Sequence, residues 1–243
     1  MRVAIHQPQF LPWLGYLDKI QQADCFVILD NVQFKKNEWQ NRNQIRTCKG
    51  TQWLTVPILH SFGQLICDVR INNTDHWKRK HLAALKTHYE GAPFFSQYFL
   101  ELQGIYSKEW QKLSDFNVKI LQWLLGHFGI DIPIQLSSDM NLRKQPTERL
   151  IDICRTVGAT TYLAGQGAQA YMNLRKFELS GLNLEIQEFE PQVYPQRYDS
   201  FVPSLSAIDL LFNCGPASPQ YLNGSRVIQK EYDRENIVTR CSA

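Results

Sequence analysis

Residues 1–16 read MRVAIHQPQFLPWLGY, and this stretch decides the fold. Residues 2–5 predict a short buried strand that runs straight into a loop with two prolines and a glycine. A helix-like stretch follows at residues 17–22, and a second apolar run spans residues 25–29. A strand, a loop, a helix and a strand within about 30 residues form the unit that builds a parallel sheet. The opening of the chain therefore predicts a parallel sheet.

The rest of the chain continues the alternation of strands and helices. Helical spacing of apolar residues and turn residues at the ends indicate the other elements. Strands are expected at residues 52–57, 65–71, 131–136, 161–165 and 184–189, and helices at residues 76–90, 146–154 and 207–213. Asp75 and Ser206 are the expected caps of two of these helices, and the end from about residue 225 is expected to be polar and loose.

These elements predict one α/β domain over residues 1–243. Its Rossmann-like, mostly parallel sheet has flanking helices, and two or three packed helices over residues 94–128 complete an inserted helical layer at about residues 76–128. This layer is open to three interpretations: a lid, a dimer surface or part of the core. A homo-oligomer is compatible with the sequence.

Composition narrows the class of protein. The chain has 243 residues, of which 44% are apolar and 20% charged, so it can bury a sizeable core. The net charge of +3 is too weak to indicate nucleic-acid binding. No apolar run reaches the ~18 residues of a membrane span, and no signal peptide is visible, so we expect a cytoplasmic protein. The six cysteines form no CxxC pair, and we predict reduced thiols and no metal site.

Two polar residues mark the expected active site. In parallel sheets, ligands bind just past the carboxyl ends of the strands. His6 and Asp30 are each the first polar group after an apolar run, so both are candidate catalytic residues. The alternative for His6 is a buried structural histidine that bonds the loop backbone. Lys19, in the helix that follows, either lines the mouth of the site or is a solvated surface residue.

A dense run of amide and guanidinium groups with one indole occupies residues 30–46. Amides can bind sugar hydroxyls, an indole can cover a ring face, and arginine grips phosphate with two parallel hydrogen bonds. We interpret the run as a binding loop rather than a polar surface loop. The candidate substrate-binding residues of this run are Gln33, Asn41, Arg42, Asn43 and Arg46. Lys80, from the basic residues 77–81, is a further candidate.

Residues 12–16, PWLGY, stand where class I nucleotidyltransferases carry a His-x-Gly-His signature. In those enzymes the signature and a helix N-terminus hold the nucleotide phosphates. Here Gly15 is kept, whereas Pro12 and Tyr16 replace both histidines. The loss of both histidines therefore argues against nucleotidyl transfer, and the resemblance to these enzymes is weak.

Six separate motifs resemble the WbqC-like family and together span nearly the whole chain. They are residues 6–15, 33–46, 53–57, 77–81, 162–165 and 194–215. The resemblance implies a place among bacterial surface-polysaccharide genes, beside enzymes that build nucleotide-linked amino sugars, and leaves the reaction open. The motifs add to the candidate substrate-binding residues Gln7, Trp13, Gly15, His81, Tyr162, Gly165, Tyr194 and Gln196.

Three functions follow as hypotheses. The first is an O-antigen enzyme that acts on a nucleotide-linked amino sugar by acyl or aminoacyl transfer, with His6 as general base near its ordinary pKa of ~6.5. Asp30 would position the amine or a metal-bound phosphate. The second is an ATP-dependent adenylating enzyme with a degenerate signature, and the third is a non-catalytic subunit that binds a sugar nucleotide. The sequence indicates no particular cofactor or acyl donor.

Overall fold

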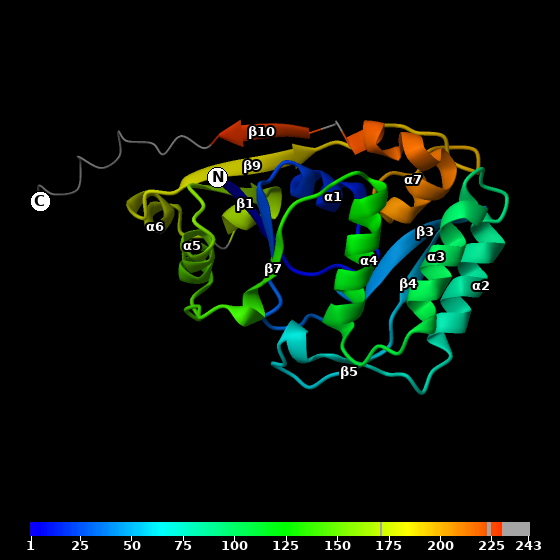
Figure 1. Cartoon of the computed structure of the whole chain (residues 1–243), viewed down its shortest axis with the longest axis horizontal. Coiled ribbons are helices and arrows are strands. Elements are labelled where there is room, and N and C mark those ends of the chain that lie inside the picture. Colours follow the sequence, from blue (N-terminus) through cyan, green and yellow to red (C-terminus); the bar gives the residue numbers. More distant parts are fainter. Residues whose placement is uncertain (171, 223–224, 230–243) are drawn as a thin grey trace, which may run out of the picture.

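The computed structural model describes residues 1–170, 172–222 and 225–229. Its centre is a six-stranded sheet in the order β10-β9-β8-β1-β2-β7 (Figure 1). The strands are β1 (Arg2–His6), β2 (Cys25–Ile28), β7 (Ile134–Leu136), β8 (Thr161–Gly165), β9 (Asn183–Phe189) and β10 (Ser225–Gln229). All neighbours pair in parallel except β9 and β10, which pair antiparallel. The predicted α/β fold with a mostly parallel sheet is confirmed.

The strand order changes direction at β1. The chain runs from β1 to β2 and β7 on one side, and then crosses to β8 and β9 on the other. In open α/β sheets, ligands bind outside the carboxyl ends of the strands at such a switch point. His6 ends β1 and Gly165 ends β8, so both residues lie at this edge.

Helices cover both faces of the sheet, because side chains on a strand alternate between its faces. Val3 and Ile5 pack in one apolar cluster with α5 (Pro146–Thr156) and α6 (Leu174–Leu179). Ala4 belongs to the other cluster, which also holds the apolar residues of α1 (Leu14–Gln21) and α7 (Ala207–Cys214). The sheet is therefore the middle layer, with α5 and α6 on one side (Figure 1).

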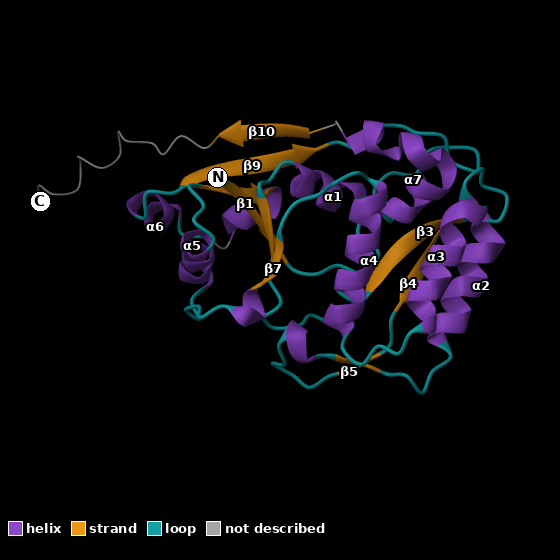
Figure 2. Cartoon of the chain, in the orientation of Figure 1, coloured by secondary structure: helices purple, strands orange, loops and turns teal. Residues whose placement is uncertain are grey.

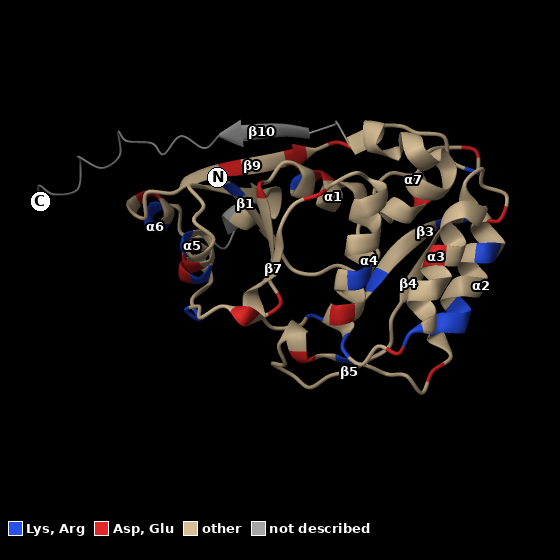
Figure 3. Cartoon of the chain, in the orientation of Figure 1, with Lys and Arg blue, Asp and Glu red and all other residues tan. Residues whose placement is uncertain are grey.

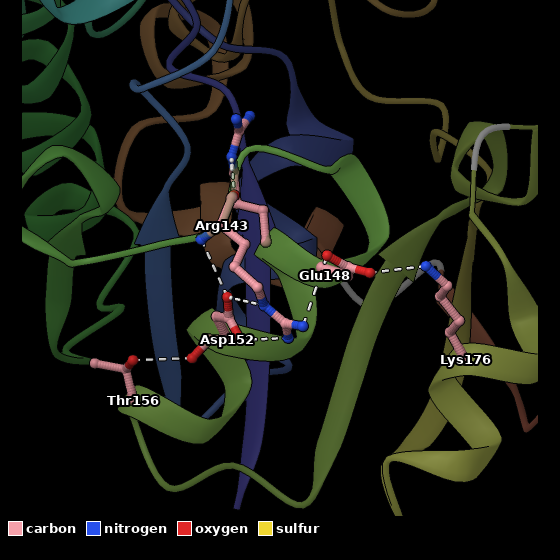
Figure 4. Close-up of polar contacts among 6 residues, drawn as sticks. Arg143, Glu148, Asp152, Thr156 and Lys176 are labelled. Atoms are coloured by element: carbon pink, nitrogen blue, oxygen red, sulfur yellow. Dashed lines mark hydrogen bonds and ion pairs between the residues drawn. The ribbon is translucent and has the colours of Figure 1, made fainter.

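Ion pairs fasten the layer of α5 and α6 at its surface (Figure 4). Arg143 donates two hydrogen bonds, of 2.8 and 2.7 Å, to the carboxylate of Asp152 on α5. Lys176 on α6 donates to Glu148 on α5 at 2.8 Å. These side chains are partly exposed to solvent, which screens their attraction, so they orient the two helices more than they stabilise the fold.

The segment between β2 and β7 builds a second part of the molecule, in which Figure 2 shows a hairpin beside helices. Its elements are β3 (Arg42–Thr47), β4 (Gly50–Thr55), β5 (Ile58–Leu59), β6 (Arg70–Ile71), α2 (Trp77–Tyr89), α3 (Phe95–Ser107) and α4 (Leu113–His127). Short 3₁₀ helices lie at η1 (Ile66–Asp68), η2 (Ser137–Asp139), η3 (Gln166–Ala170) and η4 (Gly215–Leu222). Apolar residues of the hairpin and of α2–α4 share one cluster with α1 and α7, so this part packs on the sheet layer.

Several predicted elements differ in the structure. Residues 42–46, expected as a binding loop, form strand β3, because Asn43 and Ile45 alternate inward against the core. The strand expected at residues 65–71 is η1 followed by β6. Asp75 does not cap α2: His76 is the N-cap residue, and Asp75 accepts a hydrogen bond from Lys80.

The C-terminal part also differs from the prediction. Residues 225–229, expected to be loose, pair with β9 as strand β10, so β9 is not the last strand. Helix α6 was not predicted. The remainder of the polar end, residues 230–243, lies outside the described residues. Ser206 caps α7 as predicted, since its side chain accepts from the backbone of Ile208.

Across the described ranges, no helix is both long enough and apolar enough to cross a membrane. The five cysteines described there are all free thiols.

Candidate functional site

A small cavity opens at the carboxyl end of β1. Its volume is about 160 Å³, and its walls come from the loop after β1 and from the segment before β3. The lining residues are His6, Gln7, Pro8, Gln9, Lys35, Glu38, Trp39 and Gln40. We call this cavity the His6 pocket. It lies where the strand order predicts a ligand site.

His6 enters the pocket as a neutral imidazole. Its Nδ1 lies 3.0 Å from the carbonyl oxygen of Gln7, which can only accept, so Nδ1 carries the proton and Nε2 the lone pair. Burial, and next the positive charge of Lys19, lower the His6 pKa to about 3. The expectation of an ordinary pKa is therefore wrong. Within the described part of the chain, Nε2 has no hydrogen-bond partner.

The ring of Tyr16 holds the His6 ring from the side. The two ring centroids are 5.0 Å apart with planes at 77°, an edge-to-face contact. The Tyr16 hydroxyl donates to the same carbonyl of Gln7 that His6 bonds. The backbone of Gln7 thus fixes two neighbouring rings, and His6 keeps one orientation.

Lys19 lies behind the pocket rather than on the surface, so its interpretation as a solvated residue is wrong. Its side chain is only 3% exposed, and its Nζ donates to the carbonyl of Ile5 at 3.0 Å. No carboxylate among the described residues forms an ion pair with it. Burial lowers the Lys19 pKa to about 7, since an unpaired ammonium is costly in the interior. Lys19 therefore exchanges its proton near neutral pH.

Three glutamine amides complete the wall. Gln40 donates to the side-chain oxygen of Gln7 at 2.7 Å, and its own oxygen accepts from the backbone of Lys35. Gln9 is 7% exposed, and its Oε1 has no partner among the described residues. A buried acceptor without a donor costs about 1–3 kcal/mol, so a ligand that supplies an N–H or O–H would be favoured here.

The loop that shapes the pocket is anchored from the inserted part. Leu11 has a φ of 44°, a left-handed conformation that is strained for leucine. Asn43 donates to the carbonyl of Leu11 at 2.6 Å, and the backbone of Phe10 donates to that of Trp39 at 2.9 Å. Asn43 therefore holds the loop in place and does not itself line the pocket.

Trp13 and Gly15, two candidate binding residues, pack on each other. A Cβ at Gly15 would overlap the Trp13 ring, so only glycine fits under this indole. The Gly15 carbonyl accepts a hydrogen bond from Gln187 at 2.9 Å. Trp13 thus fills the space over Gly15, and the packing gives no support to a phosphate bound there.

Asp30 has its carboxylate fully engaged. It is 1% exposed and accepts from the hydroxyl of Ser137 at 3.0 Å, and from the backbone and hydroxyl of Ser138, both at 2.8 Å. These bonds tie the end of β2 to η2. A catalytic role for Asp30 stays a prediction that would require one of these bonds to open.

A second polar cluster surrounds Asp209 on α7. Its buried carboxylate accepts from the hydroxyls of Tyr89 and Tyr194 at 2.7 and 2.8 Å, and from the amide of Gln196 at 3.0 Å. Burial raises the Asp209 pKa, and these donors oppose the rise. The hydrogen-bond partners of Asp209 are thus tyrosines and an amide rather than a buried Arg or Lys. We call these four residues the Asp209 cluster.

Arg46 lies beside this cluster and is committed to the backbone. Its guanidinium donates to the carbonyls of Thr47, Gly50 and Asp199 at 2.8–2.9 Å. Arg46 therefore joins β3 to the segment before α7. It does not line the His6 pocket, and neither do Tyr194 and Gln196.

Most other candidate residues lie outside the pocket. Three of them bond or stack within the core: Asn41 donates to the carbonyl of Val56, His81 lies between Thr55 and Tyr106, and Tyr162 stacks on Phe177. Lys80 pairs with Asp75, and Arg42 lies over the Trp53 ring. Gln33 is exposed, and Gly165 ends β8. The structure thus brings together His6, Gln7 and Lys19.

The basic residues 78–80 lie near the start of α2, where Figure 3 shows basic residues on the outside of the molecule. Residues that sequence reasoning missed are Gln9, Trp39 and Gln40. Their signal was present in the amide-rich loop beside Gln7. In the described residues, no group of three or more His, Cys, Asp or Glu side chains is placed to hold a metal ion.

Comparisons with known proteins identify the family of the chain. The model of the WbqC-like protein family matches residues 7–221. The chain is similar to the uncharacterized protein Rv1507c of Mycobacterium tuberculosis, with 36% identity over 229 residues that cover 93% of this chain and 99% of that protein. No solved structure matches. Because the match spans most of its length, the chain belongs to the WbqC-like protein family.

Proposed function

We propose that the chain is a transferase of bacterial surface-polysaccharide (O-antigen) biosynthesis that acylates or aminoacylates the amine of a nucleotide-linked amino sugar. Membership of the WbqC-like family supports the proposal of a role in surface-polysaccharide biosynthesis. The observation that carries the chemistry is the unpaired Nε2 of a neutral His6 in the pocket, with the buried Lys19 behind it. The free lone pair of Nε2 can take up the amine proton, and amine acylation needs that step.

The proposed reaction uses His6 as the proton carrier. The amine nitrogen attacks the acyl carbon of an activated acyl donor, the N–C bond forms, and the bond to the leaving group breaks. The amine proton moves to Nε2 of His6 and then to the leaving group. A pKa of about 3 makes the imidazolium a strong acid that gives its proton up readily to the leaving group. The charge of Lys19 strengthens this tendency. The low pKa also makes neutral His6 a weak base, so the proton moves only as the N–C bond forms and the amine nitrogen becomes acidic.

The pocket accepts only the reacting end of the substrate. Sites for whole drug-sized ligands have volumes of about 300–1,000 Å³, whereas the His6 pocket has about 160 Å³. A sugar amine with its neighbouring hydroxyls fits that space, and Gln7, Gln9 and Gln40 offer it amide groups. The nucleotide part of the substrate must therefore lie outside the pocket.

A thermal-shift screen with a product assay tests the proposal. The panel holds nucleotide amino sugars, the same nucleotide sugars with a hydroxyl in place of the amine, acyl-coenzyme A, amino acids, and ATP with and without magnesium. A ligand at ~100 times its dissociation constant stabilises by about 2.7 kcal/mol. We expect a shift with a nucleotide amino sugar and, with the right donor, a sugar nucleotide heavier by one acyl group in the mass spectrum.

Other outcomes would contradict this function. A shift with ATP and magnesium alone, with release of pyrophosphate, would instead support the adenylating enzyme. Binding of the nucleotide sugar without any product from the whole donor panel would support the non-catalytic subunit.

A further inference from the structure

Two tryptophans lie in contact on the surface beside the His6 pocket. Trp39 and Trp53 are 40% and 39% exposed, and their ring centroids are 5.5 Å apart with planes at 43°. The guanidinium carbon of Arg42 lies 4.2 Å from the centre of the Trp53 ring. Trp39 also lines the His6 pocket. A surface of three planar groups therefore continues outward from the rim of the pocket.

The hairpin presents this surface for a structural reason. In the antiparallel pair of β3 and β4, Gln44 faces Trp53 and Arg42 faces Thr55 on one side, whereas Asn43 and Leu54 face each other on the other. Asn43 and Leu54 are buried, so they anchor the hairpin in the core. Trp53 therefore points away from the core, and its partly exposed ring packs against Arg42 and Trp39.

We propose that Trp39, Trp53 and Arg42 form a stacking subsite for the nucleobase of the substrate. This inference rests on the proposed function and identifies where the nucleotide part binds. The base would stack on the indoles, the diphosphate would pass between Arg42 and Lys35, and the sugar amine would enter the pocket at His6. Lys35 and Trp39 both line the pocket, so the ammonium of Lys35 is available where the subsite meets the pocket.

The planar groups favour a base over a second sugar ring. Bases stack on indole rings and on guanidinium planes alike, because each base has a flat π face. The Arg42 guanidinium already lies over the Trp53 ring. Its positive charge and the ammonium of Lys35 favour a diphosphate, with Glu38 as the opposing carboxylate at the rim.

Binding of nucleoside diphosphates without any sugar tests the subsite. The probes are UDP, GDP, CDP, ADP and dTDP, with free glucosamine as the sugar without a base, measured by quenching of tryptophan fluorescence and by calorimetry. We expect at least one diphosphate to bind and Trp53→Ala to weaken it about tenfold, the usual effect of one lost stacking contact. Trp53→Phe should recover most of the affinity. Phe62→Ala, at a ring that is 98% exposed elsewhere, is the matched control and should change nothing.

The outcomes separate this inference from the proposed function. Equal binding by the wild type and by Trp53→Ala, or binding of glucosamine but of no diphosphate, would overturn the subsite. If the diphosphates bind through Trp53 and no amino sugar is ever acylated, the subsite stands and the proposed function fails. His6→Gln should bind the diphosphates as the wild type does, which shows that the subsite is independent of the chemistry. Thermal melts of each variant verify the fold.

Discussion

The His6 pocket and the Asp209 cluster both contain buried polar atoms and differ in how these atoms are paired. In the Asp209 cluster, the buried carboxylate has three donors. In the His6 pocket, Nε2 of His6 and Oε1 of Gln9 have no partner among the described residues. Both regions contain residues that the sequence suggests for substrate binding. In these two regions, polar atoms without a partner line the candidate site, whereas the paired atoms of the Asp209 cluster belong to the core.

This contrast has an energetic side. Paired buried groups stabilise the fold, whereas an unpaired buried group or charge lowers its stability until a ligand arrives. Removing a residue from the Asp209 cluster should therefore cost stability. Removing one from the pocket should cost turnover and leave stability equal or higher.

The largest effect is expected for Asp209→Leu. It leaves the hydroxyls of Tyr89 and Tyr194 and the amide of Gln196 without their acceptor in the core. The free energy of unfolding should fall by about 3–5 kcal/mol in a urea titration, the usual range for a broken buried network. Asp209→Asn, which keeps one acceptor, should lose less. An unfolding free energy equal to that of the wild type would refute the structural role.

The next largest effect is on turnover by His6→Gln. Loss of the proton carrier should lower kcat/KM for the amino sugar nucleotide about 100-fold, with less than about 1 kcal/mol change in unfolding free energy. His81→Gln is the matched control, because both ring nitrogens of His81 are bonded inside the core. That variant should lose stability and keep its turnover per folded molecule. The reverse pattern would exchange the roles of the two histidines.

Lys19→Met should make the protein more stable. The unfolded chain keeps this ammonium protonated up to its ordinary pKa of 10.5, whereas the folded pKa is about 7. Folding therefore releases a proton between these values, and the stability of the wild type rises with pH across that window. The variant should gain about 2 kcal/mol at pH 6, and the gain should shrink as the pH approaches 10. Thermal melts over this range would show a constant difference if Lys19 were solvated.

The smallest effect is expected for Lys80→Ala. Lys80 is exposed and paired with Asp75 on the outside of α2, and it lines no part of the pocket. Such a pair is screened by solvent. Neither the melting temperature nor kcat/KM should change measurably. A clear rise in KM would restore Lys80 as a phosphate ligand.

The sheet could be predicted from the sequence because its strands are short apolar runs, such as residues 25–28, between turn residues. Strand β3 could not, because Asn43 and Arg46 are polar residues that the core binds through backbone carbonyls. A run of amides and guanidinium groups has the same composition in a ligand site and in a strand that serves as scaffold. Strand β10 is likewise polar and depends on its pairing with β9.

The position of the site was predictable and much of its composition was not. His6 could be named because it ends a buried strand at a sheet edge. The burial of Lys19 depends on how α1 packs, and Gln9 and Trp39 become neighbours only when the loop folds back over β1. Arg46 attracts attention in the sequence, but it bonds the carbonyl of Asp199, which is distant in the chain. Tyr194 and Gln196 bond Asp209, and that contact depends on how α7 packs.

The pairing of His6 can be measured without any substrate. Nitrogen NMR of the labelled protein, with His6→Gln to assign the resonance, reports both the tautomer and the pKa of this ring. We predict a neutral ring with the proton on Nδ1 that does not titrate between pH 5 and pH 8, because its pKa is about 3. Titration near the ordinary value of ~6.5 would contradict the burial of this ring beside Lys19. A proton on Nε2 would contradict the free lone pair that the proposed function requires.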